Sequence, residues 1–231
     1  MSPLVLVQST SSAAASKLGN LFDLIVAGGP IMIPIGLCSV VALGFLVERM
    51  AALSKRRLAP SSFRGGLDQA LAQGAKAALD FCERQPRVAL ARVMAAGLKR
   101  FEAPRGEVER AIEEAGGREV GTMTRRLRPL VVVTAIAPLL GLLGTVWGMI
   151  QAFQVMALQK GIGKPELLAG GIAQALVTTA AGLSVAIPVQ VVYYWLKAKV
   201  DRFADAAEVV FDAVVAPRLA APAPANVNVA A

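Results

Sequence analysis

Three threonines and one glutamine are the side chains best suited to chemistry within the long apolar stretches of this chain. Thr145 lies in one stretch, and Gln174, Thr178 and Thr179 lie in the next. A hydroxyl or an amide can hydrogen-bond, but neither titrates at ordinary pH. These residues therefore supply hydrogen bonds, and a titrating group at the same depth would have to come from another chain.

The composition excludes several kinds of catalytic and metal site. The 231 residues include no histidine and only two cysteines, which leaves no Ser-His-Asp or Cys-His machinery, no zinc site and no disulfide framework. Gly65-Gly66 is not followed by the Gly-Lys-Ser/Thr of a phosphate-binding loop. We therefore expect that the chain is not an enzyme and that it binds no cofactor and no metal. We interpret Cys38 and Cys82 as small hydrophobic residues.

Three long stretches carry no charge, and the elements that hold the polar residues are among them. They cover residues 24–47, 129–159 and 167–196, which are 24, 31 and 30 residues long. About 20 apolar residues suffice for a helix to cross a bilayer, whereas buried helices of soluble proteins rarely run so far without a charge. The sequence predicts an all-α membrane protein with three transmembrane helices rather than a soluble protein with three core helices.

The basic residues predict the orientation of these helices. The net charge is +8, and residues 49–128 alone hold 17 Lys/Arg against 9 Asp/Glu. The segment 160–166 and the N-terminal segment hold few charges, so the positive-inside rule places the N-terminus outside and residues 49–128 and 197–231 in the cytoplasm. Topology explains the charge more simply than nucleic-acid binding does, and we expect no nucleic-acid partner.

The remaining segments are predicted from periodicity. Residues 1–23 fit no signal peptide, and residues from 18 onward suggest a short interfacial helix. Residues 49–128 form a cytoplasmic helical domain whose last stripe continues into the second span, and 197–216 form an amphipathic cytoplasmic helix. Residues 217–231, rich in alanine and proline, are predicted to be disordered.

Small residues recur on one side of the second and third spans. Such faces let helices approach closely, so tight packing is one interpretation and a pore-facing stripe is the other. A helical wheel puts Thr134, Pro138, Gly141, Thr145, Ala152 and Met156 together, opposite Leu140, Leu143, Trp147 and Ile150. In the third span it groups Gly171, Gln174, Thr178, Ala181, Gly182, Val185 and Val189, and Pro188 should kink the helix before an aromatic belt at residues 193–195. Gly144 and Gly148 belong to the same small-residue set.

The sequence resembles the MotA/TolQ/ExbB proton-channel family, most closely the ExbB type. The resemblance covers roughly residues 20–212. It is carried by the run from Ala137 to Ile150, by the run from Gly171 to Pro188, and by Gly28-Gly29-Pro30 with Val47-Glu48-Arg49 at the first span. MotA would normally have a fourth span, which this chain lacks.

The resemblance implies a fold and a set of partners. Members look like homopentamers whose second and third helices line a pore in the bacterial inner membrane. An ExbD-like single-span partner inside that pore would carry a protonatable Asp and pass work to a TonB-like protein. Carried over by motif, Thr145 and Thr179 would lie near that Asp, with Thr178, Thr134 and Gln174 in the same pathway. The family often has Glu where this chain has Gln174, which puts any mechanism that needs an acidic ring there in doubt.

Two other functions remain open from the sequence. One is a TolQ-like role in envelope integrity, which genomic neighbours would separate from TonB-dependent uptake. The other is a membrane scaffold that conducts nothing. Glu48 and Arg49 are either interfacial anchors or a partner contact, and the basic cytoplasmic face either binds anionic lipid headgroups or is simply solvated.

Overall fold

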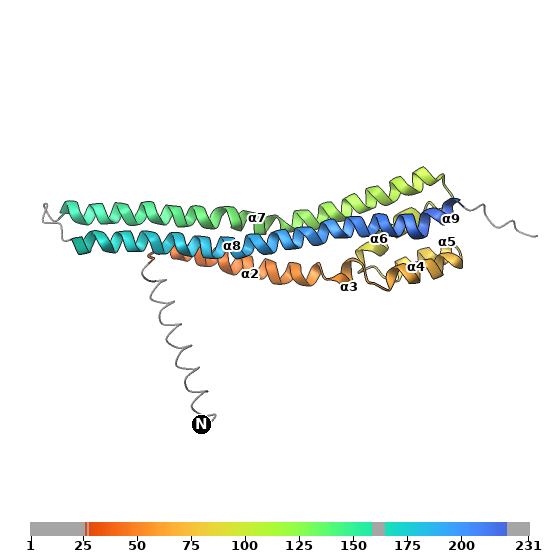
Figure 1. Cartoon of the computed structure of the whole chain (residues 1–231), viewed down its shortest axis with the longest axis horizontal. Helices are drawn as coiled ribbons and strands as arrows, with labels where there is room; N and C mark the ends of the chain where they lie inside the picture. Colours follow the sequence, from red (N-terminus) through yellow and green to blue (C-terminus); the bar gives the residue numbers. More distant parts are fainter. Residues whose placement is uncertain (1–25, 27, 159–164, 221–231) are drawn as a thin grey trace, which may run out of the picture. The chain divides into compact units, whose positions relative to one another are not determined.

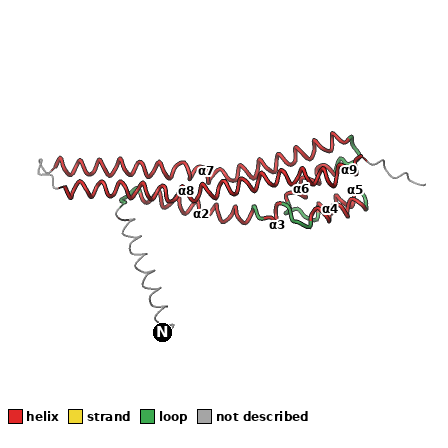
Figure 2. Tube along the Cα trace, viewed as in Figure 1, coloured by secondary structure: helices red, strands yellow, loops and turns green. Residues whose placement is uncertain are grey.

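The computed structural model describes residues 26, 28–158 and 165–220, and this part of the chain is helical without any strand (Figures 1 and 2). The all-α prediction is therefore confirmed. In chain order the elements are α2 (Met32–Ala52), α3 (Lys55–Leu58), α4 (Phe63–Ala72), α5 (Ala75–Glu83), α6 (Ala89–Leu98), α7 (Arg105–Leu158), α8 (Pro165–Val210), the π-helical η1 (Phe211–Val215) and α9 (Ala216–Ala220).

Three of these helices are long and apolar enough to cross a membrane. They are α2 with 21 residues, α7 with 54 and α8 with 46. At a rise of about 1.5 Å per residue, even α2 matches the roughly 30 Å hydrocarbon core. The longer two extend well beyond that thickness, as the sequence predicts from the amphipathic stripes before the second span and after the third.

The first span begins later than predicted. The uncharged stretch starts at residue 24, but α2 starts at Met32 because Gly28-Gly29-Pro30 makes a turn. Gly29 has φ +69°, a left-handed conformation that only glycine adopts at no steric cost. The helix then continues through Glu48 and Arg49 to Ala52, five residues past the predicted end of the span.

The other predicted boundaries shift by a few residues. Pro165 and Glu166 were assigned to the short loop but open α8, since proline suits the first turn of a helix. Residues 217–220 were assigned to the disordered tail but lie in α9. The wider turn of η1 directly before Pro217 relieves the clash that its ring would make in a regular helix. The predicted interfacial helix, residues 159–164 and residues 221–231 lie outside the described residues.

The chain divides into two compact units. The described residues of the first unit are 26, 28–46, 129–158 and 165–192, which include most of the uncharged stretches. Within it, α7 and α8 run side by side over residues 129–158 and 165–192 (Figure 1). Their contact is a stripe of small residues, whereas many large apolar side chains, among them Leu139, Leu142, Val146 and Ile150, are exposed.

The described residues of the second unit are 47–128 and 193–220, and they pack as a conventional helical core. Its largest fully buried side chains include Phe63, Leu67, Leu90, Met94 and Val108. The predicted apolar stripe after residue 197 is confirmed, because Val200, Phe203, Ala207, Val210, Phe211 and Val214 are all buried. The acidic residues between them, Asp201, Asp205, Glu208 and Asp212, are exposed.

Candidate functional site in the α7–α8 helix pair

Glycines bring the backbones of α7 and α8 into direct contact. A Cβ atom on Gly148 would lie 2.9 Å from the carbonyl oxygen of Gly171 and 3.1 Å from the backbone nitrogen of Ala175. A Cβ on Gly141 would lie 3.1 Å from the Thr178 oxygen and from the Thr179 Cα. Real Cβ atoms essentially never approach other atoms within 3.0 Å, so at Gly148 only a glycine fits this spacing.

The same holds on the α8 side of the contact. A Cβ on Gly182 would lie 2.5 Å from the carbonyl oxygen of Ala137, and one on Gly171 would lie 2.8 Å from that of Gly148. In a bilayer, helix association depends on such close packing because lipid is as apolar as the side chains. The glycine contact therefore sets the distance between the two helices that carry the polar residues.

Thr178 is buried completely at this contact. Its exposed fraction is 0%, and its side chain fills the space beside Gly144, which has no side chain of its own. The Thr178 hydroxyl donates a hydrogen bond to the Ala175 carbonyl at 2.8 Å, one turn back in α8. Its donor is thus satisfied within its own helix, as burial at membrane depth requires.

Thr179 connects the two helices. Its hydroxyl donates to the carbonyl oxygen of Gly141 in α7 at 3.1 Å, and its side chain is half-buried. The acceptor is accessible because Gly141 has no Cβ to cover the backbone. This hydrogen bond joins a predicted site residue of one span to a predicted site residue of the other.

Thr145 and Thr134 lie beside the contact rather than in it. Each is half-buried, and each hydroxyl donates to its own helix: Thr145 to the Leu142 carbonyl at 2.6 Å and Thr134 to the Val131 carbonyl at 2.8 Å. Both oxygens keep lone pairs that can accept further hydrogen bonds. A second molecule could therefore reach them, which it cannot do at Thr178.

Gln174 lies against the turn before α2. Its side-chain amide nitrogen occupies the space that a Cβ of Gly29 would need. Gly28, which is buried, lies next to Thr178, with 3.4 Å between its ideal Cβ position and the Thr178 Cγ2. The Gly28-Gly29 turn thus packs against the polar residues of α8.

The other predicted site residues are divided by their burial. Gly141, Gly144, Gly148 and Gly182 are buried and Gly171 is half-buried, whereas Pro138 is half-buried and Pro188 is exposed within α8. The wheel missed Ala137 and Ala175, which are 0% and 4% exposed in the centre of the contact. Their signal was present in the sequence as alanines at helical spacing from the glycines.

The predicted end of the first span carries an ion pair. Arg49 donates from Nη2 to Glu48, with the Arg49 side chain 10% exposed and that of Glu48 59%. On α8, the ring of Tyr193 meets that of Tyr194 edge-on, with 5.3 Å between centroids, and the Lys199 ammonium lies 3.6 Å from the Trp195 ring centroid. No cluster of potential metal ligands occurs in the part of the chain that the structure describes.

A protein-family model identifies the family to which this chain belongs. The model of the MotA/TolQ/ExbB proton channel family matches residues 86–209, more than half of the chain, and so includes both α7 and α8. The chain belongs to this family. The resemblance inferred from the sequence is thereby confirmed, and the family is one of channels rather than of enzymes.

Named relatives agree with this assignment. A putative biopolymer transport protein, ExbB-like 1, of Synechocystis sp. is 35% identical over 189 residues, which are 80% of this chain and 74% of the relative. A putative ExbB homolog of Methanothermobacter thermautotrophicus is 28% identical over 83% of this chain and 68% of its own length. The Tol-Pal system protein TolQ of Haemophilus influenzae is 38% identical over 92 residues, 40% of each chain.

Family membership and the three apolar helices together make this chain a multi-pass membrane protein, a subunit of proton-channel type. The family model ends at residue 209, within the amphipathic part of α8. The helix pair with its glycine contact and its threonines therefore lies within the part of this chain that the family model matches.

Proposed function

We propose that this chain is an ExbB-like subunit of an inner-membrane proton channel that uses the proton motive force to drive TonB-dependent transport across the outer membrane. It would act with an ExbD-like partner and assemble as a homopentamer with α7 and α8 around a pore. The N-terminus would lie in the periplasm and residues 49–128 in the cytoplasm. The observation that carries the proposal is the uncharged part of the α7–α8 pair, residues 129–158 and 167–196, with hydroxyls at the helix contact and beside it.

Electrostatics explains why a partner is needed. The stretches 24–47, 129–159 and 167–196 contain no Asp, Glu, Lys or Arg, and the chain has no His. Proton relays across a bilayer normally use ionisable side chains, because a bare charge in a low dielectric is costly. An aspartate on the partner would supply the titrating group. The hydroxyls of Thr145 and Thr179, with the amide of Gln174, would solvate it in its charged form.

The exposed apolar side chains support assembly. Leu139, Leu142, Val146 and Ile150 of α7 are all more than 40% exposed, as are Leu176 and Ile187 of α8. In a membrane these side chains meet lipid or another copy of the chain. Enclosing a pore would bury part of this surface and leave Thr145 on the side that faces the partner.

Proton flux tests the proposal directly. The full chain would be reconstituted with its ExbD-like partner in vesicles, and acidification would be followed with a pH-sensitive dye under an imposed potential. We expect Thr145→Val and Thr179→Val each to lower the flux by about tenfold, the equivalent of one lost hydrogen bond of roughly 1.4 kcal/mol. Ser184→Ala is the matched control, because Ser184 is exposed on α8 and its loss also removes one hydroxyl.

Each outcome has a defined meaning. Flux no greater than the leak of empty vesicles would contradict a channel and favour the scaffold alternative. Wild-type flux in both threonine variants would show that the pathway lies elsewhere. Native mass spectrometry of the same samples would count the subunits and the partners.

The similarity to TolQ supports a second candidate, a subunit of an envelope-integrity system. The two candidates share the channel and differ in what the channel energises. Deletion of the gene separates them: loss of TonB-dependent uptake with intact detergent resistance favours the ExbB-like role. Detergent sensitivity with intact uptake favours the TolQ-like role.

A further inference from the structure

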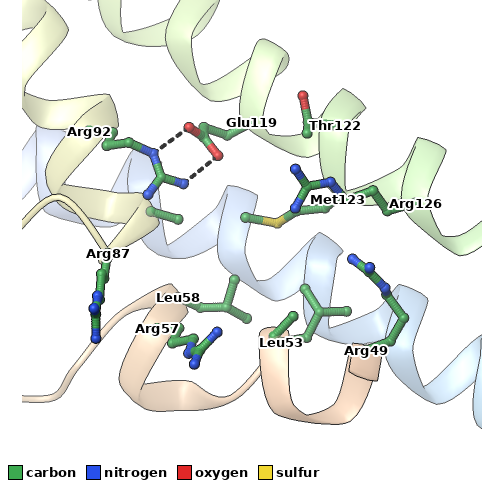
Figure 3. A pocket seen from close by; sticks show the side chains of 12 residues that line it. Arg49, Leu53, Arg57, Leu58, Arg87, Arg92, Glu119, Thr122, Met123 and Arg126 are labelled. Carbon is green, nitrogen blue, oxygen red and sulfur yellow. Dashed lines mark hydrogen bonds and ion pairs between the residues drawn. The ribbon is translucent and has the colours of Figure 1, made fainter. Parts of the chain in front are cut away.

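A cavity of about 300 Å³ in the second unit is lined by arginines (Figure 3). Its polar lining comes from the end of α2, from α3, from the segment before α6, from α6 itself and from α7. The charged residues that line it are Arg49, Arg57, Arg87, Arg92, Arg126 and a single acid, Glu119. Five cations against one anion make this lining strongly positive.

Arg92 and Glu119 neutralise each other. Nε and Nη2 of Arg92 donate to the two carboxylate oxygens of Glu119, each at 2.7 Å, in a two-pronged ion pair. This hydrogen bonding also raises the pKa of Arg92. Once the pair is set aside, four arginines of the lining face no acidic group that lines the cavity with them.

Arg49 places a buried hydrogen-bond donor at the cavity. Its side chain is 10% exposed, and its Nε atom is buried with no hydrogen-bond partner among the residues that the structure describes. Its ion-pair partner, Glu48, is 59% exposed and accepts a hydrogen bond from Nη2. A buried donor on a charged group without a partner is costly, and an anion in the cavity would satisfy it.

The other three arginines are free to bind. Within the described part of the chain, the side chains of Arg57, Arg87 and Arg126 form no ion pair, and all three are exposed. Figure 3 shows the guanidinium groups of Arg126 and Arg49 both directed toward the cavity, from α7 and from α2. Two planar guanidinium groups at one cavity match the oxygens of a phosphate, which arginine binds through paired N–H donors.

The position of these residues along their helices indicates the depth of the cavity. Arg49 comes two residues after the uncharged stretch that ends at Val47, and Arg126 comes three residues before the stretch that begins at Pro129. At about 1.5 Å per residue, both lie within roughly 5 Å of the ends of the hydrocarbon-spanning segments. Phospholipid phosphates occupy this level of a bilayer.

We propose that this arginine pocket binds a phosphate group, with Arg49 and Arg126 as its principal ligands and Arg57 and Arg87 at its rim. The phosphate belongs either to an anionic phospholipid or to a soluble phosphate compound. The pocket volume is at the lower end of the range for small-ligand sites, so it holds a headgroup rather than a large molecule. No residue that lines this pocket belongs to the glycine contact between α7 and α8.

Two binding measurements on the full chain separate the two sources. In the lipid arm, delipidated protein in detergent is titrated with phosphatidylglycerol or with phosphatidylcholine, and native mass spectrometry counts the bound lipid. In the soluble arm, thermal unfolding is followed with inorganic phosphate or with chloride at equal ionic strength. Variants Arg49→Gln and Arg126→Gln are compared with Arg100→Gln, which removes an exposed arginine that does not line the cavity.

We expect Arg126→Gln and Arg49→Gln to weaken binding by about tenfold or more, the cost of one charge-assisted contact, and Arg100→Gln to leave it unchanged. Tight binding of phosphatidylglycerol assigns the site to lipid, and stabilisation by phosphate but not chloride assigns it to a soluble ligand. If Arg49→Gln fails to fold, binding by the Arg126→Gln variant tests the proposal, because Arg126 is exposed. Absence of binding in both arms, or equal loss in Arg100→Gln, overturns the proposal.

Discussion

Replacing Gly182 with alanine tests whether the glycine contact holds α7 and α8 together. The added Cβ would lie 2.5 Å from the carbonyl oxygen of Ala137 and 3.2 Å from the Cα of Gly141. Carbon atoms in contact sit about 3.5–4.0 Å from their neighbours, so the helices would have to separate by roughly 0.5–1 Å. The obstructing atoms belong to the backbone, which cannot rotate away as a side chain does.

The magnitude follows from three contributions. Overpacking costs about 1–3 kcal/mol. Separation would also stretch the 3.1 Å bond from Thr179 to the Gly141 carbonyl beyond hydrogen-bond range, at a cost near 0.6 kcal/mol for a bond within a membrane. Alanine in place of glycine recovers about 0.5–1 kcal/mol of helix propensity. The net loss in the free energy of unfolding is then about 1–3 kcal/mol.

Equilibrium unfolding in mixed micelles with increasing dodecyl sulfate, followed by circular dichroism, measures this loss. Gly170→Ala is the matched control, because Gly170 lies in the same helix and nothing is within 4 Å of its ideal Cβ position. We expect that variant to be as stable as the wild type or about 0.5–1 kcal/mol more stable. Equal stability of Gly182→Ala and wild type would refute the argument from close packing, and so would equal losses in both variants.

Three further predictions concern the second unit. Phe63→Ala should lower the free energy of unfolding by about 3–5 kcal/mol in chemical denaturation, because Phe63 is 1% exposed, whereas Val209→Ala at a 53% exposed position should change little. Burial, and to a smaller extent the nearby carboxylate of Glu83, raises the pKa of Cys82 from 9.0 to about 12. Its neutral thiol therefore stabilises the fold below pH 9, and this contribution is lost as the pH rises toward 12. Cys82→Ala should flatten that part of a plot of unfolding free energy against pH. A double-mutant cycle on Arg92 and Glu119, which are 43% and 23% exposed, should give a coupling of about 0.5–1 kcal/mol that shrinks with salt.

The long helices could be predicted from the sequence because their signals are local. An uncharged stretch of 24 to 31 residues has few alternatives to a span. The apolar stripe from Val200 to Val214 repeats often enough to fix both helix and buried face. The predicted helix boundaries are less accurate near glycine and proline. The turn at Gly29 and the helical positions of Pro165 and Pro217 depend on backbone conformations that composition does not reveal.

The residue types of the candidate site could be predicted from the sequence, but which face of α7 turns toward α8 could not. A wheel puts Gly141 and Thr145 on one face, and both are small enough for a contact. Only the position of α8 decides that Gly141, Gly144 and Gly148 are buried while Thr145 is half-exposed beside them. The arginine pocket could not be predicted from the sequence, because its proposed ligands come from three helices and one loop and look like ordinary solvated charges in the sequence.

The geometry of the α7–α8 contact places the hydroxyls of Thr145, Thr178 and Thr179 in different environments. Water cannot reach Thr178, which is 0% exposed and bonded within its own helix, so its hydroxyl serves packing. Thr145 keeps free lone pairs but is held by a short 2.6 Å bond. In the proposed channel, Thr179 would have to release the Gly141 carbonyl before its proton could point to a partner carboxylate, and that 3.1 Å bond costs only about 0.6 kcal/mol to break. Because Gly141 is both the acceptor of this bond and a point of backbone contact, the spacing of the two helices would set how readily Thr179 turns toward the partner. The substitution at Gly182 that loosens the contact should then alter proton flux as well as stability.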